Sequence, residues 1–97
     1  LVQVIYKMNN IYLPRDSKDQ ALIGTNVGFT DEIKQGDLAF FDNEEGEITH
    51  VGILLGNKTI VHASGKVRKD HFDQQGIYNL ETGRYTHKLR IIKRIIQ

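Results

Sequence analysis

The fold is decided by residues 49–65, which read THVGILLGNKTIVHASG. Valine, isoleucine and leucine dominate two short runs in this stretch, and Gly56-Asn57-Lys58 between them has the composition of a hairpin turn. The stretch therefore predicts two antiparallel strands. Each strand carries one histidine, His50 in the first and His62 in the second.

The length of the turn determines which side chains share a face, because strand residues alternate between faces and opposed residues project from the same face. With a three-residue loop, Leu55 faces Thr59. Gly52 then lies opposite His62, and His50 lies diagonal to His62. A two-residue loop would instead place His62 among the apolar side chains of the other face. The three-residue loop keeps one face apolar, so we predict this register and expect the two imidazoles to lie within reach of each other.

Two neighbouring imidazoles can supply two members of a catalytic triad, the general base and the residue that orients it, while the nucleophile comes from elsewhere. His50 would act as the general base, and His62 would orient it through the other ring nitrogen. The spacing alone leaves a structural alternative open, in which both histidines are partly buried and satisfied by backbone carbonyls. A zinc hydrolase using His50, His62 and His71 is a weaker alternative, because no acidic residue stands at the usual ligand spacing.

The composition is typical of one small globular domain, since 39% of the 97 residues are hydrophobic and 26% are charged. The formal net charge of +1 leaves no large electrostatic footprint for nucleic acid. No apolar run approaches membrane-spanning length. The chain contains no cysteine, which excludes a disulfide, a thiolate zinc site and a cysteine nucleophile within these residues.

Two helices are predicted before the strands. Apolar residues at positions 1, 4, 5 and 8 have helical spacing. A second helix is predicted over residues 16–23, where Asp16 or Ser17 can cap the first turn. Further strands are expected at residues 38–41, 66–72 and 89–96, in one antiparallel sheet with the hairpin. Residues 73–86 are polar and turn-rich, and His87 is given no role.

Four stretches of the chain resemble the NlpC/P60 family of cell-wall cysteine peptidases. Residues 35–41 resemble the family's Pro-Gly-Asp-Leu motif, with glutamine in place of proline. Residues 49–56 resemble the strand that holds the catalytic histidine, and residues 61–65 the strand that holds the third polar residue. Leu1-Val2 resembles the residues directly after the family's Asp-Cys-Ser-Gly nucleophile motif. The resemblance implies an α+β, papain-like domain whose antiparallel sheet is packed with helices. It makes residues 1–97 the C-terminal, major part of a catalytic domain whose N-terminal part is missing.

A closer resemblance is to the γ-D-glutamyl-L-diamino-acid endopeptidases (dipeptidyl-peptidase VI-like) of that family, carried by residues 13–17, 65–68 and 84–96. It implies hydrolysis of the γ-D-glutamyl–diamino acid bond in peptidoglycan stem peptides or murein-derived peptides. His50 and His62 would be the catalytic residues, with no metal or cofactor. Asp16 and Ser17 would line the substrate pocket and bind the free amino end of the peptide. The nucleophilic cysteine is expected just before Leu1, so these 97 residues alone are expected to be inactive.

Two other functions stay open beside this one. A related Cys–His amidase or acyltransferase would share the relay but not the pocket of Arg15, Asp16 and Ser17. A catalytically inactive cell-wall-binding module would keep the fold and lack the cysteine upstream. The family also implies a bacterial protein, either in the cell envelope, secreted, or cytoplasmic for murein recycling, with SH3-like domains upstream in the parent chain.

Overall fold

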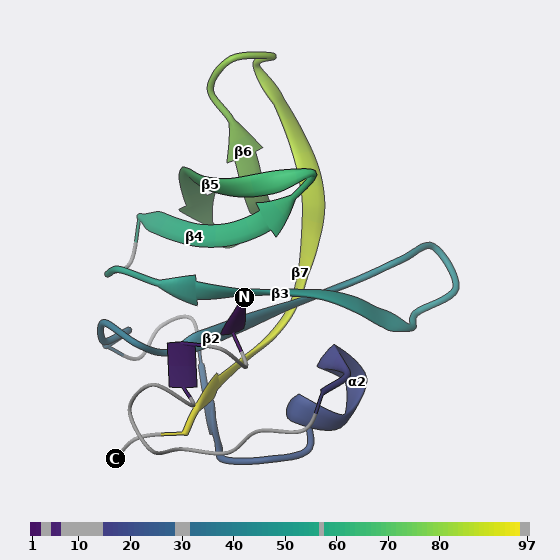
Figure 1. The fold of residues 1–97 in the computed structure, drawn as a ribbon, viewed down its shortest axis with the longest axis vertical. Helices are drawn as coiled ribbons and strands as arrows, with labels where there is room; N and C mark the ends of the chain where they lie inside the picture. The colour runs from purple at the N-terminus through teal and green to yellow at the C-terminus, as the bar shows by residue number, and fades with distance from the viewer. Residues whose placement is uncertain (3–4, 7–14, 29–31, 57, 96–97) are drawn as a thin grey trace.

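The computed structural model describes residues 1–2, 5–6, 15–28, 32–56 and 58–95. In these residues most of the chain forms antiparallel β-sheet (Figure 1). The elements are α2 (Ser17–Gln20), β1 (Thr25–Val27), β2 (Leu38–Asp42), β3 (Ile48–Leu54), β4 (Thr59–Ser64), β5 (Lys66–Asp73), β6 (Gly76–Asn79) and β7 (Arg84–Arg94). The strand order is β1-β7-β2-β3-β4-β5-β6, and β7 also pairs with β6.

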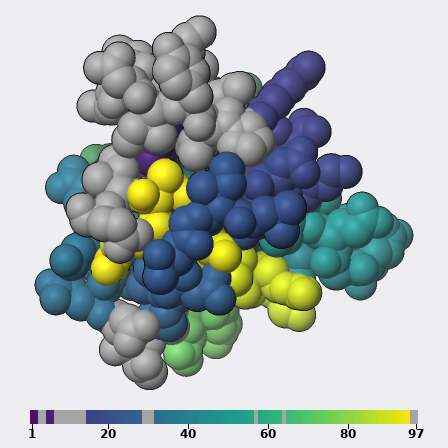
Figure 2. Space-filling view, turned by 90° about the horizontal axis from the view of Figure 1, so that it is seen from below, coloured from purple at the N-terminus to yellow at the C-terminus, as the bar shows by residue number. Residues whose placement is uncertain are grey.

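β7 pairs along both of its edges, so the six strands from β2 through β7 close into a barrel. Residues 88–93 of β7 pair with β2 along one edge, and residues 84–88 pair with β6 along the other. β1 continues the second edge, where Thr25 lies opposite Arg94. In Figure 2 the blue atoms around β1 lie beside the yellow end of β7. Closure gives backbone partners to strands that would otherwise be edges of an open sheet.

The predicted α+β architecture, with an antiparallel sheet packed by helices, is wrong: the described residues form a closed barrel with only short helical segments. The prediction missed β1, β6 and the first half of β7. Residues 84–86 and several later positions of β7 are exposed, so the strand carries little hydrophobic periodicity there. Its backbone hydrogen bonds to two neighbours hold it in the barrel, and a local pattern does not reveal such long-range partners.

The part of the chain that the structure describes has no helix long and apolar enough to cross a membrane.

The predicted hairpin register is confirmed. Gly52 lies opposite His62, and the Leu55 N–H donates to the Thr59 carbonyl oxygen at 2.9 Å. One assumption behind the prediction is nevertheless wrong. The face that carries the histidines points into the barrel, and the His62 side chain is only 1% exposed. The three-residue turn is predicted because it keeps His62 off the apolar face of the hairpin. His62 is nevertheless buried, because its own face also points into the barrel.

Strand alternation sorts the side chains of β2 between two cores. Ala39 and Phe41 belong to the cluster inside the barrel, whereas Leu38 and Phe40 belong to a second cluster on its outer side. Val2 and Tyr6, from the N-terminal helical segment, complete the outer cluster. This packing holds the start of the chain against the outside of β2 and β3. Figure 1 shows α2 on the same side, next to β3.

A side chain at Gly52 would collide with its neighbours in the hairpin. A Cβ atom there would lie 2.5 Å from Cδ1 of Ile60 and 3.1 Å from Cβ of His62. We expect Gly52→Ala to lower the free energy of unfolding by about 1–3 kcal/mol, because the packed interior must shift. Thermal unfolding followed by circular dichroism measures this as a lower Tm, whereas Lys66→Ala, an exposed control on β5, should stay within about 0.5 kcal/mol of the original chain. An unchanged Tm for Gly52→Ala would contradict the close packing around His62.

Candidate active site

Three neighbouring strands contribute to one hydrogen-bonded chain of side chains. His50 lies on β3, His62 on β4 and Asp70 on β5. Nε2 of His50 lies 2.8 Å from Nδ1 of His62, and Nε2 of His62 lies 2.7 Å from Oδ2 of Asp70. The two histidines that the sequence singled out are therefore partners of each other. Both nitrogens of His62 have side-chain partners, so the alternative of imidazoles satisfied only by backbone carbonyls does not describe this site.

Asp70 is held in place by Arg68, two residues earlier on the same face of β5. The Arg68 guanidinium donates from Nε to Oδ2 at 2.7 Å and from Nη2 to Oδ1 at 3.1 Å, a bidentate geometry that fixes the plane of the carboxylate. Burial raises the pKa of Asp70, but the hydrogen bonds from Arg68 and His62 outweigh burial, and the pKa is lowered from its usual value. Asp70 is therefore an ionised acceptor at neutral pH.

The ionised carboxylate determines the tautomer of both rings when the imidazoles are neutral. A carboxylate only accepts, so Nε2 of His62 must carry the proton. Nδ1 of His62 then has the lone pair and accepts from the Nε2–H of His50. This leaves the lone pair of His50 on Nδ1. The chain from Asp70 thus orients His50 as a base whose free nitrogen can take a proton from a nucleophile.

His87, on β7, lies against this chain. Its ring stacks on that of His50, with the centroids 4.1 Å apart and the planes inclined by 20°. Burial, followed by repulsion from His87 and then from His62, lowers the pKa of His50 to about 4. Burial also lowers the pKa of His87. His50 is therefore uncharged at neutral pH in the described structure, as a proton acceptor must be.

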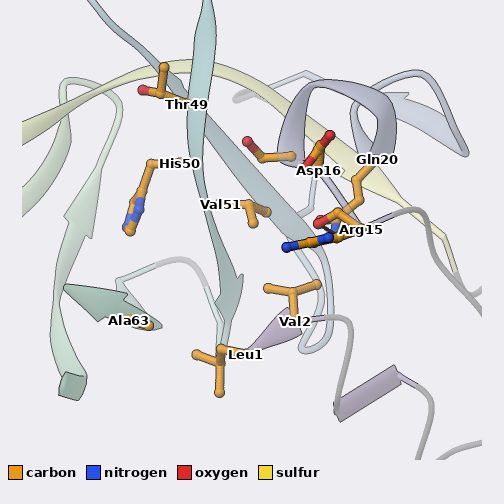
Figure 3. A pocket seen from close by; sticks show the side chains of 10 residues that line it. Leu1, Val2, Arg15, Asp16, Gln20, Thr49, His50, Val51 and Ala63 are labelled. Atoms are coloured by element: carbon orange, nitrogen blue, oxygen red, sulfur yellow. Dashed lines mark hydrogen bonds between the residues drawn. The ribbon is translucent and has the colours of Figure 1, made fainter. Parts of the chain in front are cut away.

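A pocket of about 350 Å³ opens beside His50 (Figure 3). It is lined by Leu1, Val2, Arg15, Asp16, Ser17, Gln20, Thr49, His50, Val51 and Ala63. Figure 3 shows His50 on one side of the pocket and the side chains of Arg15 and Asp16 on the other, with Val51 between them. The wall opposite the imidazole is thus polar and contains both a cation and an anion.

Asp16 and Ser17, predicted both as helix caps and as pocket residues, lie at the start of α2. Asp16 is the N-cap residue by position, but its side chain makes no capping hydrogen bond. Both side chains line the pocket. The carboxylate of Asp16 is exposed and therefore accessible to a ligand in the pocket. Asp16 therefore occupies the N-cap position and the pocket wall, without a hydrogen bond that would make its side chain a cap.

Sequence reasoning missed Asp70, Arg68 and His87. Asp70 had a usable signal, because strand alternation puts it on the same face as Phe72, and a carboxylate on an apolar face needs a partner. His87 had none, because β7 approaches β3 only through closure of the barrel. The weaker zinc hypothesis chose the wrong third histidine: among the described residues the histidines that cluster are His50, His62 and His87, while His71 lies against Tyr78.

The carboxylate–imidazole–imidazole chain ends at the half-buried His50 beside a polar pocket, an arrangement in which an imidazole can act as a general base. The chain matches the NlpC/P60 family over residues 1–92, and it belongs to that family. A solved structure of an NlpC/P60 family protein from Bacillus cereus ATCC 10987 superimposes with a TM-score of 0.74 and 26% identity, over 99% of this chain and 30% of the other.

Two curated relatives are similar over part of the chain. The γ-D-glutamyl-L-lysine dipeptidyl-peptidase of Bacillus subtilis (strain 168) is 44% identical over 61 residues, which cover 61% of this chain and 20% of that protein. The probable endopeptidase NlpC of Escherichia coli (strain K12) is 45% identical over 56 residues, which cover 57% of this chain and 36% of that protein. The matched regions therefore make up only about a fifth and about a third of these relatives.

The lowered pKa of His50 makes stability depend on pH. The unfolded chain takes up a proton on this histidine near pH 6.5, whereas the folded chain resists until about pH 4. The unfolded state therefore binds more protons in this window, and we expect the free energy of unfolding to fall as the pH is lowered from about 6.5 to about 4. Urea unfolding across this range measures the slope, and imidazole NMR should give a His50 midpoint near 4. The slope should be smaller in His50→Gln, and a His50 midpoint near 6.5 would contradict the buried, neutral base.

Proposed function

We propose that this chain is the C-terminal, major part of the catalytic domain of a cysteine peptidase that hydrolyses the γ-D-glutamyl–diamino acid bond of bacterial peptidoglycan peptides. The observation that carries the proposal is the chain Asp70–His62–His50, which presents a neutral imidazole at the wall of a polar pocket. The family membership and the peptidase names of the curated relatives support the same class of reaction.

The proposed nucleophile is a cysteine directly before Leu1. Leu1 and Val2 line the same pocket as His50, so the preceding residue would lie close to the imidazole. The Ile5 N–H donates to the Leu1 carbonyl oxygen at 3.0 Å, which makes Leu1 the start of a helical turn. A thiol at the N-terminus of a helix and beside a histidine has a lowered pKa and reacts as the thiolate.

In the proposed reaction, His50 accepts the thiol proton on Nδ1 and the thiolate attacks the γ-carbonyl carbon of D-glutamate. His50 then donates this proton to the leaving amine, and afterwards activates the water that hydrolyses the thioester. His62 and Asp70 stabilise the imidazolium and hold the ring plane during both transfers. His62 touches the base directly, whereas Asp70 acts through His62 and is a positioning residue.

Asp16 and Ser17 are the residues proposed to bind the free amino end of the substrate. The exposed carboxylate of Asp16 faces His50 across the pocket and could form a charge-assisted hydrogen bond with a free amino group. This arrangement would select peptides with an unblocked N-terminus, which a stem peptide beginning with L-alanine and γ-D-glutamate has once it is released from the glycan. The name of the Bacillus subtilis relative, a dipeptidyl-peptidase, fits removal of such a pair.

The positioning role of Asp70 is tested by Asp70→Asn in the protein that carries the cysteine. Loss of a charge-assisted hydrogen bond of roughly 1.5–3 kcal/mol should lower kcat/KM about ten- to a hundredfold. The acidic limb of the kcat/KM profile should also move to lower pH, because the anion no longer favours the imidazolium. Asp73→Asn is the matched control, since Asp73 lies on the same strand but accepts from Tyr85 instead. Equal effects of the two substitutions would argue against the relay.

The pocket role of Asp16 is tested by Asp16→Asn, because asparagine caps a helix about as well as aspartate. We expect kcat/KM on L-Ala-γ-D-Glu-diamino-acid peptides to fall about ten- to a hundredfold, with little change in Tm. The preference for a free over a blocked N-terminus should largely disappear. Asp19→Asn is the control, since Asp19 is an exposed acid of the same helix turn that does not line the pocket. If Asp16→Asn keeps both activity and amine preference, Asp16 does not bind the amine.

A further inference from the structure

Three imidazoles from three strands of the barrel converge. His50 on β3, His62 on β4 and His87 on β7 each offer a ring nitrogen, and these nitrogens all lie within 4.8 Å of one another. The ring centroids are 4.1 Å apart for His50 and His87 and 5.6 Å apart for His62 and His87. The proposed peptidase mechanism uses only two of these rings. His87 is bonded to its neighbour Thr86 and has no part in the proton transfers.

We propose that His50, His62 and His87 form a binding site for a divalent transition metal of the zinc class, and that the bound ion switches the relay off. Imidazole is the nitrogen ligand that such ions prefer, and three protein ligands with a fourth position left to water are a common zinc arrangement. The metal-binding half of this proposal stands on the histidines alone. The inhibitory half rests on the proposed function.

The surroundings of His62 match those of a metal ligand. Its Nε2–H donates to Asp70 at 2.7 Å, and Asp70 is itself held by Arg68. A carboxylate behind an imidazole orients the ring and makes its other nitrogen a better ligand. Nδ1 of His62, the nitrogen that this bond leaves with a lone pair, is the one that points at His50.

Binding one ion requires the three rings to shift and one of them to rotate. Zinc–nitrogen bonds of about 2.0–2.1 Å in a tetrahedral site put ligand nitrogens roughly 3.4 Å apart. The His50 and His62 nitrogens are closer than this, at 2.8 Å, and no pair in the group exceeds 4.8 Å. An imidazole nitrogen binds a metal in the plane of its ring, and the His50 and His87 planes are inclined by only 20°, so one of these two half-buried rings also has to rotate. With that rotation and shifts on the order of 1 Å, all three nitrogens reach bonding distance of one ion.

Nε2 of His50 cannot bind a metal ion and donate its hydrogen bond to His62 at the same time. In the relay, Nε2 of His50 carries a proton and donates it to His62. An ion between these two rings needs the lone pairs of both nitrogens, so that proton has to move from Nε2 to Nδ1 of the same ring, the nitrogen that would otherwise act as the base. The hydrogen bond that orients the base is then lost, and a His50 ring held by the ion is no longer free to serve as the base.

The binding half is tested by titrating Zn²⁺ into the chain by calorimetry. The chain has four histidines and no cysteine, so His87→Phe and His71→Phe form a matched pair. The phenyl ring of His87→Phe preserves the stack on His50 but removes one nitrogen. We expect it to weaken Zn²⁺ binding at least about tenfold, because even the partners behind a ligand are worth about 10–100-fold. His71→Phe should bind as tightly as the original chain, and equal affinity of His87→Phe would overturn the site.

Imidazole NMR keeps the test decisive if a variant fails to fold. In the unsubstituted chain, Zn²⁺ should perturb the resonances of His50, His62 and His87 together and leave those of His71 in place. Perturbation of His71 alone would overturn the proposal.

Inhibition is measured on the cysteine-bearing protein, with the rate of each variant normalised to its rate without Zn²⁺. His87→Phe should raise the half-inhibitory Zn²⁺ concentration about tenfold over that of the unsubstituted protein. Binding at the three histidines without any loss of activity would overturn the inhibitory half, whereas a protein with no peptidase activity would instead count against the proposed function.

Discussion

β7 pairs with β2 along one edge and with β6 along the other, and the site depends on this double pairing. The closure turns the inner faces of β3, β4 and β5 toward β7, so that His87 comes to lie on His50. An ion pair between Arg94 and Asp37 joins the C-terminal end of β7 to the start of β2. Arg94 of β7 donates to both carboxylate oxygens of Asp37, at 2.9 and 2.8 Å, directly before β2. Asp37 is 2% exposed, and loss of its partner would leave an uncompensated charge inside the protein.

The same burial explains both the stability and the chemistry of the relay. His62 is tolerated in the interior because each of its ring nitrogens has a partner, which removes most of the cost of burying a polar group. Asp70 is tolerated because Arg68 and His62 share its charge. His50, at the edge of this buried chain, is desolvated without a charged partner, and its pKa falls to about 4. The packing that closes the barrel therefore also keeps the base neutral.

The pocket depends on the two-sided character of β3. Consecutive residues point to opposite faces of a strand, so His50 faces the interior while Val51 packs in the outer cluster with Val2. The outer cluster brings the start of the chain against β3, and α2 lies beside the same strand (Figure 1). A polar wall built by Asp16 and Ser17 can thus face an imidazole whose orientation is determined from inside the barrel.

The sequence by itself determined the hairpin of β3 and β4, its three-residue turn and the shared face of His50 and His62. Parity sufficed there, because residues joined by a short turn have a register that alternation constrains strongly. Only the tertiary structure decided the closed barrel and the positions of Asp70 and His87. The pairings β2–β7 and β6–β7 connect strands through backbone groups that every residue possesses, so side-chain patterns do not select them. The prediction of helices packed on a sheet failed for this reason, whereas the two histidines, twelve residues apart, lie within hydrogen-bonding distance of each other as the hairpin register predicts.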